Sequence, residues 1–241
     1  MDKLSINIIA TSDIHAPAGL SLLRKATSSV NFDADIMILA GDLIDRGKKE
    51  YYGEVLRILD SLGDIPKIAV FGNDEFDSIK EDLKKEFGGE IIFLDDGALT
   101  MVISGISVGI VGTKGSLERP TSWQRSNIPG ISRIYEERIS TIGKLISELK
   151  TDVRILVSHY APTFRTLAGE DPSTWKFLGH RGYEEIIVKN KLSLVVHGHS
   201  HRGLRKAVIG STPVYNVALP LWKELVCISI SASPAGLNSF F

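Results

Sequence analysis

Short apolar runs that end in turn or metal-binding residues constrain the fold of this chain more than any other feature. Ile6–Thr11, Ile36–Ala40 and Lys67–Phe71 are too short for typical helices, and their composition predicts buried strands. Amphipathic stretches with helical spacing separate them, at Gly19–Val30 and Lys48–Leu62. Because strands and helices alternate, we expect a parallel sheet in this half of the chain.

The second half of the chain predicts a different arrangement. Ser104-Gly105 joins two apolar runs and is a hairpin signal. Strands are expected at Val153–Ser158 and Leu192–His197, followed by three antiparallel strands near the end, and helices at Ile131–Leu149 and Tyr183–Lys189. Two mixed sheets packed together and flanked by helices accommodate this pattern. We therefore expect an α/β fold in one domain spanning residues 1–241.

Composition excludes several classes of protein. With 241 residues, 43% of them hydrophobic, the chain can bury a large core. A net charge of −1 favours neither a nucleic-acid nor a membrane partner, and no apolar stretch approaches the roughly 18 residues of a membrane span. The first apolar run predicts a strand and not a signal peptide. The single cysteine, Cys227, excludes an internal disulfide, favours a cytoplasmic location, and is predicted to be a buried thiol.

Polar side chains follow five of the predicted strands. Each piece alone has an ordinary structural explanation, such as a helix N-cap or a hydrogen-bonded histidine. Together they place many metal-binding side chains at one sheet edge, where sites form in open α/β sheets. Asp, Asn and His suit Mn²⁺, Fe²⁺ or Zn²⁺, and their number suits two ions. The stretches are SDIH at 12–15, GDLID at 41–45, GNDE at 72–75, SH at 158–159 and HGHSH at 197–201.

In this order, the motifs Asp-x-His, Gly-Asp-x-x-Asp, Gly-Asn-x-Asp/Glu, His and Gly-His-x-His resemble those of the calcineurin-like metallophosphoesterases. The resemblance spans residues 13 to 201 and implies a four-layer α/β/β/α sandwich with two divalent metal ions, of which Mn²⁺ is favoured over Fe²⁺ or Zn²⁺. It also implies hydrolysis of a phosphate ester by a metal-bridging hydroxide. The implied ligands are Asp13, His15 and His201 for the first ion, Asn73, His159 and His199 for the second, and Asp42 as the bridge.

Other residues of these motifs have supporting roles in this interpretation. His197 points away from the ions by strand alternation, and Asp45 is expected to orient a ligand histidine. The stretch GDLIDRG at 41–47 is similar to a motif of Ser/Thr protein phosphatases, in which the arginine contacts phosphate. Arg46 is therefore a candidate substrate-binding residue, although a solvated arginine also fits this position.

The chain departs from the family at Asp74, where most members have histidine. Two divalent ions, less the charges of Asp13, Asp42 and hydroxide, leave about +1, which an ionised Asp74 would cancel. A phosphomonoester dianion would then be attracted less than a diester monoanion. Asp74 is the candidate catalytic residue, but nearby cations should depress its pKa and make it a poor general acid. Arg165 and His180 are candidate replacements for the missing histidine.

These observations favour a metal-dependent phosphodiesterase. A phosphomonoesterase, including a Ser/Thr-type protein phosphatase, is the main alternative, and a metal-binding scaffold without activity is another. Residues 113–130 are expected to be a long loop that covers the metals and sets substrate choice, or that forms a surface excursion or a dimer contact. The expected partner is a phosphate-ester substrate, without a membrane or nucleic acid, and the helix at 131–149 could pack against a second copy in a homodimer.

Overall fold

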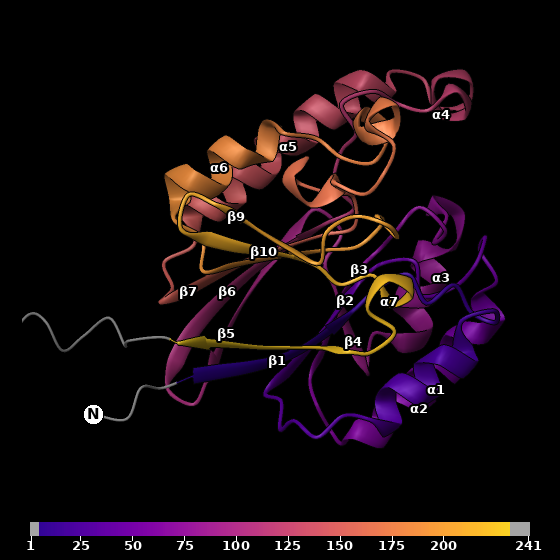
Figure 1. Ribbon diagram of the computed structural model, residues 1–241, viewed down its shortest axis with the longest axis vertical. Helices are drawn as coiled ribbons and strands as arrows, with labels where there is room; N and C mark the ends of the chain where they lie inside the picture. Colours follow the sequence, from indigo (N-terminus) through magenta and orange to yellow (C-terminus); the bar gives the residue numbers. More distant parts are fainter. Residues whose placement is uncertain (1–4, 232–241) are drawn as a thin grey trace, which may run out of the picture.

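The protein is described by a computed structural model that covers residues 5–231. Two β-sheets pack face to face, and helices cover the outer face of each sheet (Figure 1). The predicted α/β/β/α sandwich of two mixed sheets is therefore confirmed. Among residues 5–231, no helix combines the length and apolar character needed to cross a membrane.

The first sheet has the strand order β11-β1-β2-β3-β4. Its four N-terminal strands are parallel, as the alternation of strands and helices predicts, and β11 pairs antiparallel with β1. The strands are β1 (Ser5–Thr11), β2 (Ile36–Ala40), β3 (Lys67–Val70), β4 (Ile91–Phe93) and β11 (Val226–Ser231).

The second sheet has the order β5-β6-β7-β8-β10-β9. The predicted hairpin is present, with β5 antiparallel to β6, and β9 is antiparallel to β10 at the other edge. The inner strands are parallel. The strands are β5 (Gly97–Ile103), β6 (Ile106–Thr113), β7 (Val153–Ser158), β8 (Leu194–His197), β9 (Lys206–Ile209) and β10 (Thr212–Asn216).

Three apolar layers hold the sandwich together. One lies between the sheets, one beneath α1 (Leu20–Ser28), α2 (Tyr52–Leu59) and α3 (Lys80–Phe87), and one beneath α5 (Ile131–Glu148) and α6 (Gly182–Asn190). Strands buried on both faces need continuous apolar runs, which is why β2 is wholly apolar and β8 is apolar up to His197. The remaining helices are α4 (Ser122–Asn127), α7 (Leu219–Trp222) and 3-10 turns at Lys49–Tyr51, Asp60–Leu62, Asp77–Ile79, Arg165–Leu167 and Pro172–Phe177.

Two expectations about this fold are wrong. Cys227 is exposed, because β11 is an edge strand whose alternation turns Val226 and Ile228 inward and the thiol outward. The segment 113–130 is not wholly irregular, because it contains α4. Thr121 caps this helix, and its hydroxyl accepts from the backbone of Gln124 while the Gln124 side chain accepts from the backbone of Thr121.

Candidate metal centre

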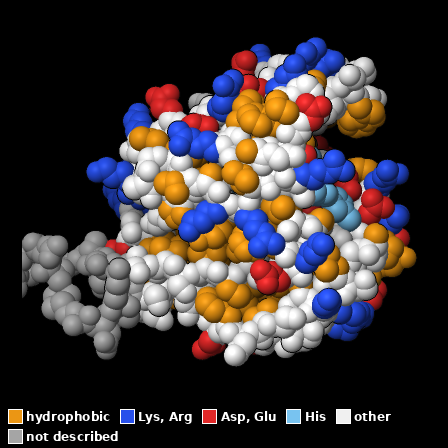
Figure 2. All heavy atoms as spheres, viewed as in Figure 1, with side chains coloured by type: hydrophobic (Ala, Val, Ile, Leu, Met, Phe, Trp, Pro, Cys, Tyr) orange, Lys and Arg blue, Asp and Glu red, His pale blue; other side chains and the backbone are white. Residues whose placement is uncertain are grey.

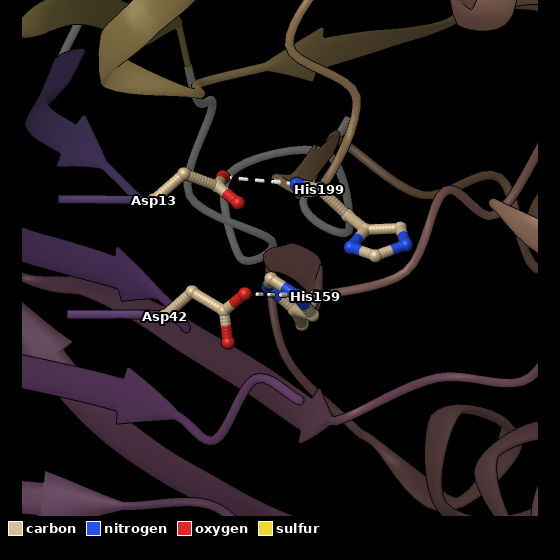
Figure 3. A group of neighbouring side chains, drawn as sticks. All are labelled: Asp13, Asp42, His159 and His199. Carbon is tan, nitrogen blue, oxygen red and sulfur yellow. Dashed lines mark hydrogen bonds and ion pairs between the residues drawn. The ribbon is translucent and has the colours of Figure 1, made fainter. Parts of the chain in front are cut away.

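The predicted ligands meet where strands of both sheets end. Asp13 and Asp42 follow β1 and β2 of the first sheet, and His159 and His199 follow β7 and β8 of the second. Figure 3 shows these four side chains clustered together. The His199 backbone N–H donates to Asp13 Oδ2 over 2.9 Å, and His159 Nε2 lies 3.3 Å from Asp42 Oδ2. The site therefore bridges the two sheets.

The side chains form three overlapping groups, each with ligand atoms within 4.8 Å of one another. Asp13 and Asp42 each belong to two of the groups, so both contact residues assigned to different ions. This placement fits the predicted bridging position of Asp42. The groups are Asp13, Asp42, His159 and His199; Asp13, His15 and His201; and His15, Asp42 and Asp74.

The second group has a free ligand atom. His201 Nε2 lies 3.1 Å from Asp13 Oδ1, and His15 Nε2 lies 3.8 Å from the same oxygen. His15 Nε2 is buried, and it has no hydrogen-bond partner among residues 5–231. A buried imidazole nitrogen without a partner costs free energy unless a ligand uses it, so the atoms present fit a divalent cation.

Asn73 extends the first group. Its Oδ1 lies 3.1 Å from His159 Nε2, so the side-chain oxygen of Asn73 faces the same space as the carboxylate of Asp42. His159 Nδ1 is 2.9 Å from the carbonyl of Ala40, which can fix the ring so that Nε2 points into the cluster. The donor set of two nitrogens and several oxygens suits Mn²⁺, Fe²⁺ or Zn²⁺.

The backbone is strained at this site. Asp13, His15, Asp42 and His199 all have positive φ angles, between 49° and 69°. Residues other than glycine in this region cost on the order of 1–3 kcal/mol each and persist only where the surrounding structure enforces them. Such a concentration of strain at one sheet edge is typical of functional sites.

Glycines allow the loops to approach closely. A Cβ on Gly72 would lie 2.1 Å from Asp42 Oδ1, and a Cβ on Gly198 would lie 2.5 Å from Asp13 Oδ2. Gly41 has a φ of 85° and lies against Gly72 and His159. Each of these glycines directly precedes a candidate ligand, so the small residue permits the approach that brings the ligands together.

Glu75 organises two of the loops, a role that the sequence analysis did not assign. Its buried carboxylate accepts from the backbone N–H of Asp42 at 2.8 Å, Leu43 at 2.6 Å and Gly72 at 2.7 Å. Burial and the charge of Asp42 together raise the pKa of Glu75 to about 7, against the lowering effect of the N–H donors. The only sequence signal was its place at the end of the GNDE motif.

Electrostatics at the cluster favour bound cations. Burial opposes charge on His159, but the neighbouring Asp42 raises its pKa to about 9. Burial and the charge of His159 lower the pKa of His199 to about 3. The pKa of Asp13 is lowered although burial acts to raise it, because His201 and Ser12 donate hydrogen bonds to its carboxylate. Metal ligation needs neutral imidazole, so metal binding would release the His159 proton.

Asp74 lies at the rim of the cluster. Its Oδ2 is 3.2 Å from His15 Nδ1, its Oδ1 accepts from Asn73 Nδ2 at 3.0 Å, and its backbone N–H donates to Asp42 Oδ1 at 2.7 Å. Burial acts to raise the pKa of Asp74, but the hydrogen bond from His15 lowers it. The residue is therefore a carboxylate, and it holds His15 with Nε2 directed toward Asp13.

The predicted substrate-binding residues, unlike the predicted ligands, do not belong to the three ligand groups. The Arg46 side chain is 81% exposed, and the Arg165 guanidinium donates to the carbonyl of Val208 on β9. His180 Nδ1 accepts from the backbone of Gly182, and burial lowers its pKa. In residues 5–231, none of the three side chains forms a hydrogen bond or ion pair with a predicted metal ligand, although the backbone of Arg46 bonds the Asp74 carboxylate. Their roles stay predictions.

Asp45 and His197 are predicted to lie around the ligands without binding an ion, and the two predictions have different outcomes. Asp45 contacts Lys48, with Oδ2 at 2.7 Å from Nζ, so the prediction that it orients a histidine is wrong. His197 is buried and outside the three groups, as strand alternation predicts. Its Nε2 lies 2.9 Å from Thr166 Oγ1, so it supports the loop beneath the site.

Comparison with known proteins agrees with this geometry. The sequence pattern of the calcineurin-like phosphoesterase domain matches residues 6–203. The chain belongs to the calcineurin-like phosphoesterase family. Members of this family depend on a dinuclear metal centre and act on phosphate esters, which is the class of activity that the sequence predicts.

Individual relatives are distant. A probable glycerophosphodiester phosphodiesterase of Arcobacter nitrofigilis is 24% identical over 202 residues, covering 83% of this chain and 63% of that protein. The phosphopantetheinyl hydrolase of Mycobacterium tuberculosis has a TM-score of 0.71 at 14% identity, with 93% and 96% of the two chains covered. The NAD nucleotidase of Haemophilus influenzae has a TM-score of 0.59 at 15% identity, with 97% and 50% covered. The two solved structures support the fold.

Proposed function

We propose that this calcineurin-like phosphoesterase hydrolyses a phosphodiester and uses two divalent ions, with Mn²⁺ as the first choice. The observation that carries the diester preference is the Asp74 carboxylate, whose Oδ2 lies 3.2 Å from His15 Nδ1. The name of the Arcobacter nitrofigilis relative, a probable glycerophosphodiester phosphodiesterase, supports the same class of substrate.

Each ion would have its own set of ligands. Asp13, His15 and His201 would hold one ion, and Asn73, His159 and His199 the other, with Asp42 between them. A pair of divalent ions supplies Lewis acidity toward the phosphoryl oxygens and makes a water more acidic. Glu75, through its bonds to the backbone on both sides, keeps Asp42 and Asn73 at a fixed separation.

Asp74 determines the charge that a substrate meets. Its lowered pKa keeps it ionised at neutral pH, so it repels a phosphomonoester dianion more than a diester monoanion. It also accepts from His15, which favours the tautomer with a free Nε2 lone pair. Asp74 therefore acts through charge and through His15, and an ionised carboxylate is a poor proton donor to a leaving group.

One observation favours a second candidate function, a phosphomonoesterase. The Arg46 side chain is 81% exposed, and its neighbour Gly47 donates its backbone N–H to the carbonyl of Asp74 at 2.8 Å. Arg46 therefore extends from a loop joined to the rim of the metal centre. A guanidinium there could offset Asp74 and bind a dianion, as in the protein-phosphatase motif that GDLIDRG resembles.

The test compares bis(p-nitrophenyl) phosphate with p-nitrophenyl phosphate, on protein stripped with EDTA and refilled with Mn²⁺. The Asp42→Asn variant is the control for a contaminating phosphatase. We expect faster turnover of the diester. Faster turnover of the monoester would contradict the argument from Asp74 and favour the second candidate. No turnover of either ester, with two ions bound per chain, would favour a scaffold without activity.

A further inference from the structure

One long stretch of the chain carries basic residues and no acidic residues. From Ile186 to Lys223 there is no Asp or Glu, although the whole chain has a net charge of −1. Two of the basic residues, Lys189 and Lys191, lie at the end of α6. The others follow His201 or lie near α7, and they are Arg202, Arg205, Lys206 and Lys223.

These last four residues, which we call the basic surface, are exposed. The guanidinium of Arg205 stacks over the ring of Trp222 at 4.5 Å, and the ammonium of Lys206 lies 4.7 Å from the ring centre of Tyr215. Figure 2 shows Lys and Arg side chains along the front face, from β10 toward α7, with the pale-blue histidines to the right. Stacking on a ring holds a cation in place and reduces the entropy that it loses when it binds a ligand.

Hydrogen bonds join Trp222, the ring on which Arg205 stacks, to the metal centre. Trp222 Nε1 donates to the carbonyl of Asn216 at 2.6 Å, and Asn216 Nδ2 donates to the carbonyl of Ser200 at 2.7 Å. Ser200 lies between the candidate ligands His199 and His201. The Leu219 backbone N–H in α7 donates to the carbonyl of Ser12 at 2.9 Å, beside Asp13. The basic surface therefore has a defined position relative to the site.

Protein carboxylates do not neutralise this charge. In the part of the chain that the structure describes, none of the four side chains forms an ion pair, whereas Arg138 and Arg181 pair with Asp96 and Glu118. The nearby Glu170 accepts from Ser200 Oγ and from the backbone N–H of Arg202, not from its guanidinium. Glu224 follows Lys223 and is the one acidic neighbour in sequence. The basic surface is thus free to bind an anion.

We propose that the basic surface binds a second phosphate group of the substrate, one that is not cleaved. This inference rests on the proposed phosphodiesterase function. Arg202, Arg205 and Lys223 extend the binding site beyond His201, on the side of α7, and guanidinium forks suit phosphate oxygens. The substrate class is a phosphodiester whose alcohol carries a further phosphate. Binding of this second phosphate would also offset the negative charge of Asp74, because it attracts an anionic substrate at a place away from the metals.

The test uses two chromogenic diesters that differ by one phosphate. One is the p-nitrophenyl ester of thymidine 5′-phosphate, and the other carries an additional 3′-phosphate. On Mn²⁺-loaded wild-type protein, we expect kcat/KM to be at least about fivefold higher for the ester with two phosphates, since each exposed charge contributes modestly. The double variant Arg205→Gln/Lys223→Gln should lose this preference. Lys189→Gln/Lys191→Gln removes the same charge on α6 and should keep it.

Equal kcat/KM for the two esters on wild-type protein would overturn the inference, as would an equal loss of preference in both double variants. A binding measurement separates this outcome from failure of the proposed function. Calorimetry in EDTA with thymidine 3′,5′-bisphosphate needs no turnover, and binding should weaken at least about fivefold in Arg205→Gln/Lys223→Gln alone. If wild-type protein binds the bisphosphate in this way but hydrolyses neither ester, the phosphodiesterase proposal fails and the basic surface stands. Unchanged binding in that variant refutes the basic surface.

Discussion

Replacing Gly198 by alanine should damage the metal centre through one atom. The new Cβ would lie 2.4 Å from Ser12 Oγ and 2.5 Å from Asp13 Oδ2, both far inside van der Waals contact. Asp13 Oδ2 accepts from Ser12 Oγ at 2.5 Å and from the His199 backbone at 2.9 Å. The carboxylate must move away from the added methyl group, so both bonds lengthen or break.

The size of the effect follows from those two bonds. A hydrogen bond to a charged acceptor is worth about 1.5–3 kcal/mol, and partial loss of two such bonds gives about 2–4 kcal/mol less free energy of unfolding. Asp13 belongs to two of the three ligand groups, so its displacement should also weaken Mn²⁺ binding by at least about tenfold.

The assay has two parts and a matched control. Urea unfolding measures stability, and calorimetric titration with Mn²⁺ measures affinity. Gly53→Ala in α2 is the control, because its Cβ would meet only ring carbons of Phe87 at 3.6 and 3.7 Å. Alanine in a helix should raise the free energy of unfolding by about 0.5–1 kcal/mol there and leave Mn²⁺ affinity unchanged.

The outcome for Gly198→Ala has a clear refutation. Wild-type stability together with wild-type Mn²⁺ affinity would mean that Asp13 tolerates the added methyl group. The close approach of the loops after β1 and β8 would then not be what positions the ligands. A loss of stability with unchanged Mn²⁺ affinity would support the close packing of Gly198 against Asp13. It would also show that Asp13 is not a ligand.

Three further predictions follow from the site. Glu75→Gln should lower the free energy of unfolding by about 1–3 kcal/mol, because the amide has one acceptor oxygen and cannot accept from all four backbone N–H groups that bond the carboxylate; a urea curve that coincides with wild type would contradict this. Asp74→His should raise the rate ratio of p-nitrophenyl phosphate to bis(p-nitrophenyl) phosphate, and Asp74→Asn should raise it less; an unchanged ratio in both would show that the Asp74 charge does not select the substrate. The pKa of His197 is lowered to about 4 by burial, below the value near 6.5 of an unfolded chain, so its contribution to stability is fully present above pH 6.5 and is lost as the pH falls toward 4. Urea unfolding in EDTA measures this effect. Between pH 6.5 and pH 4, the free energy of unfolding should fall by up to about 3 kcal/mol more in wild type than in His197→Gln, and parallel pH profiles would refute the assignment.

The sequence predicted the sheets well, because their strands have strong local signals. The parallel strands β1 to β3 are apolar runs that end in turn residues, and the hairpin of β5 and β6 has Ser104-Gly105 at its turn, both with positive φ. Cys227 was mispredicted because β11 is an edge strand, and an apolar run does not show which of its faces a neighbour covers. The α4 helix was missed although Thr121 and Gln124 form a capping box, because the surrounding composition is that of a loop.

By itself, the sequence determined the kinds of ligand and their order along the chain. Asp13, Asp42 and His159 each follow a strand, and parallel strands carry their carboxyl ends to one edge. Only the tertiary structure decided how closely these ends approach. Contacts such as Glu75 with the backbone of Asp42 and Leu43, or Gly198 against Asp13, join segments far apart in sequence, and local propensity contains no information about them. The same holds for the basic surface, since charges spread along a chain form one surface only after the strands and α7 have packed.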